Sequence, residues 1–234
     1  MRKDVEVYKL IVFDLDGTLA PVGKGTTAEN LKLLYKLEDK GYRIAICSGK
    51  PTYYLCGYAR QLGLRAPILV GENGAVIQFG VDLPPRDYYV LPYEKSAKRA
   101  IKNMREAIDE EYPDMWYQPN EVMLTPFPFR EEQFDWIQEY IDNHESELSG
   151  LDIYRHFDCF DIVPKGISKK EGLRYLSQLL SVPAEETIAV GDGVNDYPMF
   201  EYAGLSLGIG LKDAEKVNHN FKDISEALMY LLDL

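Results

Sequence analysis

Short runs of consecutive apolar residues recur along this chain, and most of them end at a glycine or an aspartate. Runs that are apolar throughout, rather than at alternate positions, are typical of strands that are covered on both faces of a parallel sheet. The pattern predicts strands at residues 8–13, 42–47, 68–70, 75–77, 187–190 and 205–207.

Segments with helix-capping signals separate these strands. Two of them begin with a capping box, Thr26-x-x-Glu29 and Ser168-x-x-Glu171, whose side chains can satisfy free amides of the first helical turn. Helices are expected at residues 26–38, 51–62 and 168–180, shortly after 196, and from 224 onward. The alternation of strands and helices predicts an α/β fold with a Rossmann-like parallel sheet.

A different pattern occupies the middle of the chain, where aromatic residues become dense. Strand character is expected at residues 88–92, 115–127 and 151–163, and helices at 94–111 and 131–148. Residues 115–127 can form one strand or a hairpin. This block predicts a small α+β domain, residues 83–162, inserted into an α/β domain that consists of residues 1–82 and 163–234.

Composition narrows the class of protein. The chain has 234 residues, 46% of them apolar, which is long and apolar enough to bury a core. Its net charge of −12 argues against nucleic acid and anionic membrane surfaces as partners, because these need clustered Lys and Arg. The three cysteines, Cys47, Cys56 and Cys159, have no zinc-site spacing and suggest no disulfide framework.

Two further features bear on location. Residues 1–6 are mixed in charge and lack the apolar stretch of a signal peptide. No window approaches the ~20 apolar residues that a membrane span needs. We therefore expect a cytoplasmic protein.

Several residues that could take part in catalysis or bind a ligand follow the ends of the predicted strands. Asp14 and Asp16 follow the first strand two positions apart, so both side chains can face one crevice. Two such carboxylates repel each other unless a cation, a shared proton or a reaction separates their roles. Ser48 follows the second strand and Asp192 the strand at 187–190, while Lys169 lies in the first turn of a helix. Since ligands bind outside the carboxyl ends of parallel strands, these residues are predicted to converge.

Four motifs in this order resemble those of the haloacid dehalogenase (HAD) superfamily, and within it the Cof-type phosphatases with a type-IIB cap. The matching segments are Asp14-Leu-Asp16-Gly-Thr18, Ser48 in Cys47-Ser48-Gly49-Lys50, Lys169 in Gly166-Ile-Ser-Lys169, and Gly191-Asp192-Gly193-Val-Asn195-Asp196. The resemblance covers essentially the whole chain. Two departures, Lys50 where arginine is frequent and a short cap, bear on the substrate.

The resemblance implies a role for each motif residue. Asp14 would be the nucleophile that forms an aspartyl-phosphate, and Asp16 the general acid and base. Phosphate would be bound by Ser48, Gly49, Lys169 and Asn195. Mg²⁺ would be held by Asp14, the backbone carbonyl of Asp16, Asp192 and Asp196. Ligation by oxygen alone favours Mg²⁺ over zinc.

Other residues have two interpretations. Trp116, Tyr117, Phe127 and Arg155 of the inserted domain can contact substrate or fill a small core. Asn73, in Glu72-Asn73-Gly74, can serve a ligand or a tight turn.

The leading hypothesis is a Mg²⁺-dependent phosphatase of a small phosphorylated metabolite, such as a sugar phosphate or phosphoglycolate. A phosphomutase on a similar core is the nearest alternative. A non-catalytic protein that binds a phosphorylated ligand is a further one. A receiver-type signalling domain is disfavoured by Asp16 and by the inserted domain.

Overall fold

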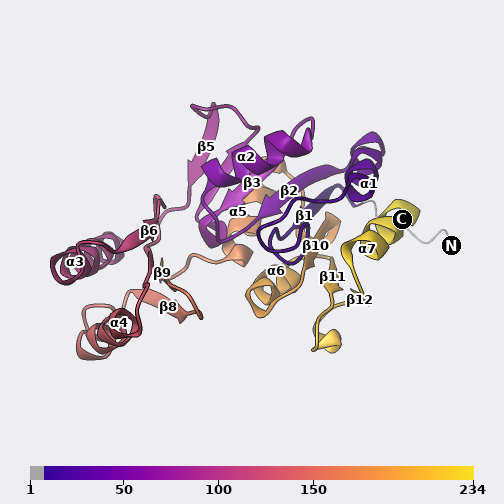
Figure 1. Cartoon of the computed structure of the whole chain (residues 1–234). Helices are drawn as coiled ribbons and strands as arrows, with labels where there is room; N and C mark the ends of the chain where they lie inside the picture. Colours follow the sequence, from indigo (N-terminus) through magenta and orange to yellow (C-terminus); the bar gives the residue numbers. More distant parts are fainter. Residues whose placement is uncertain (1–7) are drawn as a thin grey trace. The chain divides into compact units, whose positions relative to one another are not determined.

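The computed structural model describes residues 8–234, so the segment in which we expect no signal peptide lies outside the described residues. Contacts within the chain divide it into two compact units (Figure 1). The first unit consists of Met1–Tyr89 and Ser168–Leu234, and the second of Val90–Ile167. These boundaries lie a few residues after the domain boundaries that the sequence pattern predicts.

The first unit contains an eight-stranded sheet with the order β12-β11-β10-β1-β2-β3-β4-β5. Its strands are β1 (Leu10–Phe13), β2 (Arg43–Cys47), β3 (Ile68–Gly71), β4 (Val76–Phe79), β5 (Asp87–Val90), β10 (Thr187–Gly191), β11 (Leu205–Ile209) and β12 (His219–Phe221). β1 pairs in parallel with β2 and β10, whereas β4 runs antiparallel to β3. Every residue of β1, β3 and β10 is buried, which explains their unbroken apolar sequences. The predicted α/β fold class is confirmed.

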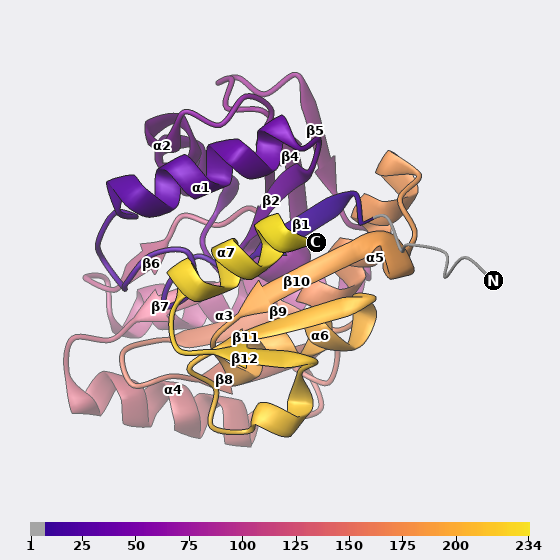
Figure 2. The ribbon, with the colours of Figure 1, turned by 90° about the vertical axis from the view of Figure 1, so that its right-hand side faces the viewer.

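Helices cover both faces of this sheet (Figure 2). They are α1 (Ala28–Asp39), α2 (Thr52–Leu62), α5 (Lys169–Leu180), α6 (Tyr197–Tyr202) and α7 (Ile224–Asp233), with short 3₁₀ turns η1 (Glu72–Gly74), η2 (Ala184–Glu186), η3 (Val194–Asp196) and η4 (Ala214–Lys216). One core joins α1, α2 and α7 to inward side chains of the sheet such as Phe13, Ile46 and Val190. Helices α5 and α6 pack together on the other face.

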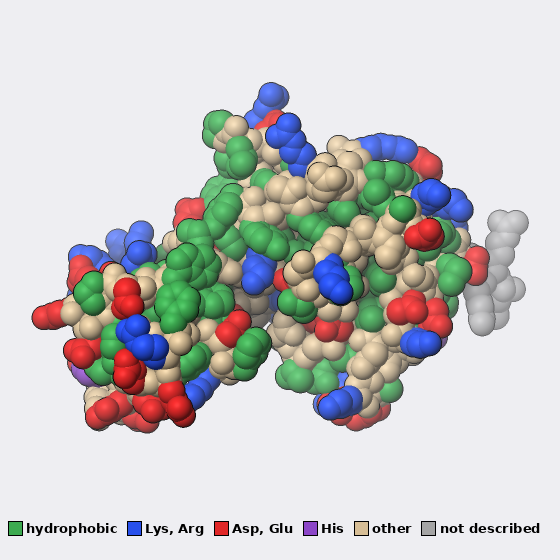
Figure 3. Space-filling view, viewed as in Figure 1, with side chains coloured by type: hydrophobic (Ala, Val, Ile, Leu, Met, Phe, Trp, Pro, Cys, Tyr) green, Lys and Arg blue, Asp and Glu red, His purple; other side chains and the backbone are tan. Residues whose placement is uncertain are grey.

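The second unit has two helices and two hairpins. Its elements are α3 (Lys95–Glu111), β6 (Trp116–Gln118), β7 (Thr125–Phe127), α4 (Glu131–Asn143), β8 (Leu151–Arg155) and β9 (Phe160–Pro164). A bridge between Leu124 and Ile162 connects the hairpins, over a core that includes Met104 and Phe160. Asp and Glu outnumber Lys and Arg here by more than two to one. Many of these carboxylates gather over α4 (Figure 3).

Some expected element boundaries are wrong. The N-cap of α1 is Thr27, which accepts a hydrogen bond from the amide of Asn30 at 3.2 Å, because the Thr26 hydroxyl instead donates to the carbonyl of Leu19. Helix α4 ends at Asn143 rather than near 148, since turns follow it.

The other differences from the expected elements concern a hairpin and the two edge strands of the sheet. The strand expected at residues 88–92, within the inserted domain, is β5, which lies at the edge of the first unit's sheet beside β4. Residues 115–127 form a hairpin, one of the two alternatives expected there. The strand character expected at 151–163 is also a hairpin, around a turn closed by the amide of His156 and the carbonyl of Cys159. Strand β12 was not expected, because its His-Asn-Phe sequence has no apolar run.

Candidate active site

The site is built at one edge of the sheet of the first unit. β1, β2 and β10 are neighbouring parallel strands, so their carboxyl ends share this edge. Asp14 follows β1, Ser48 follows β2 and Asp192 follows β10. The amide of Asp14 donates to the carbonyl of Val190 at 2.8 Å, which fixes the end of β1 against β10.

Lys169 joins two of the acidic residues. Its side chain is only 1% exposed, and its Nζ donates to Asp14 Oδ1 and to Asp196 Oδ1, each at 2.6 Å. Lys169 is the first residue of α5, and the N-cap hydroxyl of Ser168 accepts from the amide of Glu171 at 3.2 Å. The helix start therefore delivers the ammonium group to the end of β1, and the predicted convergence of Asp14 and Lys169 is confirmed.

Burial and charge shift the pKa values of these groups. Burial, opposed by the neighbouring Lys169 charge and supported by the charges of Asp196 and Asp192, raises the pKa of Asp14 to about 7. Burial by itself would lower the pKa of Lys169, but Asp14 and Asp196 outweigh it and hold this pKa above its ordinary value. The ammonium is therefore a permanent positive charge inside the site.

Asp14, Asp192 and Asp196 form an acidic cluster. Each offers a carboxylate oxygen, and these oxygens all lie within 4.8 Å of one another. Asp196 is fully buried, and its Oδ2 accepts from the amides of Asp192 and Gly193 at 3.0 and 3.1 Å. One lysine for three carboxylates leaves excess negative charge, and the donors are hard oxygens. The cluster therefore fits a divalent cation such as Mg²⁺.

Glycine is required beside this cluster. Gly17 has φ +91°, and a Cβ there would lie 2.2 Å from Asp192 Oδ2. A Cβ on Gly191 would lie 2.5 Å from the carboxyl carbon of Asp196. The glycines of the first and fourth motifs thus allow the backbone to approach the carboxylates closely.

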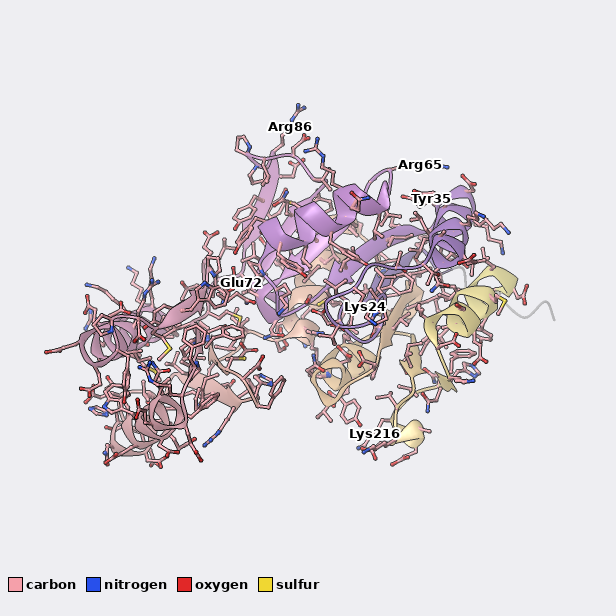
Figure 4. The ribbon with its side chains drawn as sticks, in the orientation of Figure 1. Lys24, Tyr35, Arg65, Glu72, Arg86 and Lys216 are labelled. Carbon is pink, nitrogen blue, oxygen red and sulfur yellow. The ribbon has the colours of Figure 1, made fainter. Side chains whose placement is uncertain are left out.

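A strained turn supports the loop after β2. Glu72 and Asn73 both have positive φ, 53° and 54°, which is uncommon for residues other than glycine. The amide of Asn73 donates to the carbonyl of Ser48 at 3.1 Å, and the amide of Glu72 to that of Lys50 at 3.0 Å. Figure 4 labels Glu72 in this turn. The turn holds the Ser48–Lys50 backbone in a fixed conformation.

The same turn packs against the start of α5. A Cβ on Gly74 would lie 2.3 Å from the carbonyl oxygen of Ser168, and one on Gly172 would lie 2.6 Å from the Cα of Gly74. Glycine inside a helix is unfavourable by roughly 1 kcal/mol relative to alanine, so this close backbone contact gives Gly172 its physical reason. It links the Ser48 loop to the residue that precedes Lys169.

Asp16 and Asn195, two other predicted site residues, also lie outside the acidic cluster. Asp16 is half-buried, and its backbone bridges to Ala20. Burial and the negative charge of Asp16 together raise the pKa of the Tyr58 hydroxyl to about 12, so the side chains of Asp16 and Tyr58 lie near each other. Asn195 is exposed, and its amide oxygen lies close to the backbone of Gly193.

Thr18 has a role in the site that was not expected from its sequence context. Its buried hydroxyl donates to Asp192 Oδ1 at 2.6 Å, across 174 residues of sequence, and so orients a cluster carboxylate. The sequence feature that could have indicated this role is the position of Thr18 within the first motif. Cys47 also lies near Lys169, but burial raises the pKa of its thiol to about 12, which makes it a poor nucleophile.

The aromatic candidates of the second unit have partners there. The Tyr117 hydroxyl donates to Asp109 at 2.7 Å, with Arg105 over its ring. Trp116 packs edge-on against Phe127 with ring centroids 5.0 Å apart, although half of its surface is exposed. These contacts give Tyr117 and Phe127 structural roles within the unit.

Known proteins resemble this chain over nearly its whole length. A phosphoglycolate phosphatase of Metallosphaera sedula is 30% identical over 213 residues, which are 89% of this chain and 88% of that protein. The 5-amino-6-(5-phospho-D-ribitylamino)uracil phosphatase YitU of Bacillus subtilis is 27% identical over 86% of each chain.

Solved structures share the fold. A haloacid dehalogenase-like hydrolase from Bacteroides thetaiotaomicron superposes with a TM-score of 0.80 at 19% identity, over 96% of this chain and 99% of that one. The HAD subclass IIB sugar phosphatase BT4131 superposes with a TM-score of 0.69 at 19% identity, over 95% and 98%.

Among residues 8–234, no helix has the length and apolarity needed to cross a membrane.

The sequence model of the haloacid dehalogenase-like hydrolase family matches residues 11–82 and 86–220. With the four motifs meeting at one sheet edge, these matches establish that the chain belongs to the haloacid dehalogenase-like hydrolase family.

Proposed function

We propose that this protein is a Mg²⁺-dependent phosphatase that hydrolyses small phosphomonoesters through an aspartyl-phosphate on Asp14. One observation carries the proposal: the buried Lys169 ammonium lies between Asp14 and Asp196, and Asp192 completes an acidic cluster. A strand end that offers a carboxylate, a fixed cation and a set of oxygen ligands has what phosphoryl transfer requires.

In the first step, an Asp14 carboxylate oxygen attacks phosphorus and the bond from phosphorus to the leaving oxygen breaks. The Asp16 carboxyl donates its proton to that oxygen, so an alcohol leaves. Lys169 and the hydroxyl of Ser48 stabilise the charge on the phosphoryl oxygens. The raised pKa of Asp14 belongs to the site without a bound cation, and a cation would favour the reactive carboxylate.

In the second step, Asp16 takes a proton from water while the water oxygen attacks phosphorus. The bond from phosphorus to Asp14 breaks, which restores the Asp14 carboxylate and releases phosphate. Asp14, Asp192 and Asp196, with the backbone carbonyl of Asp16, would hold Mg²⁺, which neutralises phosphoryl charge when it is bound. Thr18 would keep Asp192 oriented for that role.

We further propose a small organic phosphate as the substrate and the second unit, Val90–Ile167, as the cap domain. The relatives named above are phosphatases of phosphoglycolate and of a phosphorylated uracil derivative, both of metabolite size. The net charge of −12 disfavours the approach of polyanionic macromolecules.

Hydrolysis of p-nitrophenyl phosphate with and without Mg²⁺ tests the proposal. We expect turnover with Mg²⁺, none in excess EDTA, and recovery when Mg²⁺ is added back. Full activity in EDTA contradicts the role of the metal, and no activity on any phosphomonoester contradicts the function. Transfer of the phosphoryl group to a second sugar hydroxyl, in place of water, would indicate a phosphomutase.

A further inference from the structure

A hollow in the second unit combines exposed aromatic rings with positive charge. Its volume is about 300 Å³, and it is lined by Pro128, Phe129, Arg130, Glu131, Phe134, Arg155, His156 and Phe157. Phe129 is 68% exposed and Phe157 is 94% exposed. Single exposed apolar residues are ordinary, but two phenylalanines from separate segments around one hollow indicate a binding surface.

Arg155 is held in this hollow by ring contacts. Its guanidinium carbon lies 5.5 Å from the ring centroid of Phe134 and 5.7 Å from that of Phe160. Phe160 is fully buried, so the arginine rests on a fixed support. Ring contacts engage the face of a guanidinium, whereas its N–H donors lie in the plane. Among the described residues, Arg155 has no ion pair, so these donors remain available to a ligand.

The other charges of the hollow are largely compensated. Arg130 is paired with Asp114 at 3.2 Å and with Glu132 at 2.9 Å. His156 faces Asp161, with 3.4 Å between Nε2 and Oδ2, and Glu131 adds one exposed carboxylate. Arg155 is the only Lys or Arg between residues 131 and 164, a segment rich in Asp and Glu. Its free charge is therefore a local exception in an acidic unit.

We propose that this hollow binds a planar aromatic ring that carries a carboxylate. The exposed phenylalanine rings would pack against the ring, and the planar fork of Arg155 matches a carboxylate with two parallel hydrogen bonds. A phosphate dianion fits less well, because a single unpaired arginine in an acidic unit cannot neutralise two charges. The inference does not depend on the proposed phosphatase function.

Titration of the full chain with non-reactive probes tests the proposal. The probe is 4-hydroxybenzoate, and phenol and acetate carry only its ring or only its carboxylate. We expect NMR shift changes at Phe129, Arg155 and Phe157, with 4-hydroxybenzoate binding more tightly than either fragment. No change at these residues up to the solubility limit of the probe would overturn the proposal.

Variants assign the contacts. Arg155→Met keeps the alkyl stem and should weaken 4-hydroxybenzoate binding about tenfold, as expected for the loss of charge-assisted hydrogen bonds, without affecting phenol. Phe157→Ala should weaken binding of both ring-bearing probes and keep the fold, because the Phe157 side chain is 94% exposed. Arg99→Met, at an exposed arginine outside the hollow, is the matched control. Equal losses in Arg155→Met and Arg99→Met would refute the assignment, as would an unchanged affinity in Arg155→Met.

Enzyme kinetics can show whether the aromatic carboxylate is the organic part of the substrate or a separate ligand. If it is the organic part of the substrate, 4-hydroxybenzoate inhibits competitively, and Arg155→Met lowers kcat/KM for 4-carboxyphenyl phosphate but not for glycerol phosphate. If it is a separate ligand, the probe binds without competing. A protein that binds the probe but hydrolyses no phosphomonoester would refute the proposed function and leave this inference standing.

Discussion

At the scale of single residues, Asp14 combines burial with contact to a fixed cation. We expect Asp14→Asn to remove turnover and keep the fold, because the amide preserves shape but cannot form the acyl phosphate. A loss of at least a hundredfold in kcat, about 2.7 kcal/mol, is expected on p-nitrophenyl phosphate. Circular dichroism would check the fold, and residual activity above about 1% of wild type would mean that another group is the nucleophile.

A substitution at Thr18 tests whether the orientation of Asp192 affects the affinity for Mg²⁺. Thr18→Val removes the hydroxyl that donates to Asp192 and keeps the side-chain shape. We expect Mg²⁺ affinity to fall by roughly tenfold, in the range seen when groups that orient metal ligands are lost. Calorimetric titration with Mg²⁺ would measure this. Thr26→Val is the control, since Thr26 donates to the carbonyl of Leu19 in the same loop. Equal affinities for both variants would argue against a role for Thr18.

The stability of the second unit is expected to depend on pH through His156. Its hydrogen bond to Asp161 raises the pKa of His156 above the ordinary 6.5, and burial opposes the rise only in part. The protonated form is therefore favoured by folding. The resulting stabilisation is complete below pH 6.5 and is lost as the pH rises through the folded-state pKa. NMR titration should show the raised value, and Asp161→Asn should lower it; a value unchanged by this substitution would mean that another group causes the shift.

At the scale of elements, the contact between η1 and α5 positions Lys169. Gly74→Ala would bring a Cβ within 2.3 Å of the carbonyl of Ser168, so either the turn or the helix start has to move. We expect lower kcat together with lower stability, because the Lys169 ammonium is displaced from Asp14. Thermal unfolding and steady-state kinetics would measure the two effects.

Gly41→Ala is the matched control for this substitution. Gly41 has φ +93°, close to the +101° of Gly74, but a Cβ there meets nothing within 4 Å. The control should therefore lose stability by about 1 kcal/mol from backbone strain alone and keep its kcat. If both variants lose the same fraction of kcat, the contact does not position Lys169.

At the scale of the whole molecule, the acidic net charge favours small substrates over polyanionic macromolecules. We expect kcat/KM for metabolite-sized phosphomonoesters to exceed that for phosphopeptides and oligonucleotide ends, because a chain of net charge −12 repels polyanions at long range. A substrate panel at fixed ionic strength would measure the order. A tenfold preference for any phosphopeptide or oligonucleotide over all small esters would contradict the assignment.

The α/β class, the order of most elements and the motif residues can be predicted from the amino-acid sequence. Each of these depends on local patterns: unbroken apolar runs, the Ser168 cap, and aspartates that directly follow strands. Local patterns gave the wrong N-cap for α1, because the Thr26 hydroxyl donates to the carbonyl of Leu19 instead of capping the helix. They also missed β12, which is a strand only because it pairs with β11.

The contacts between groups that are distant in sequence follow from the packing of the elements. The Thr18 bond to Asp192, the Lys169 bridge between two aspartates, and the backbone contact of Gly74 with Ser168 all join segments far apart in sequence. The free charge of Arg155 likewise depends on which carboxylates lie near it and which do not. No spacing along the chain encodes such contacts, because they arise from how β1, β10 and α5, or β8, β9 and α4, pack in space.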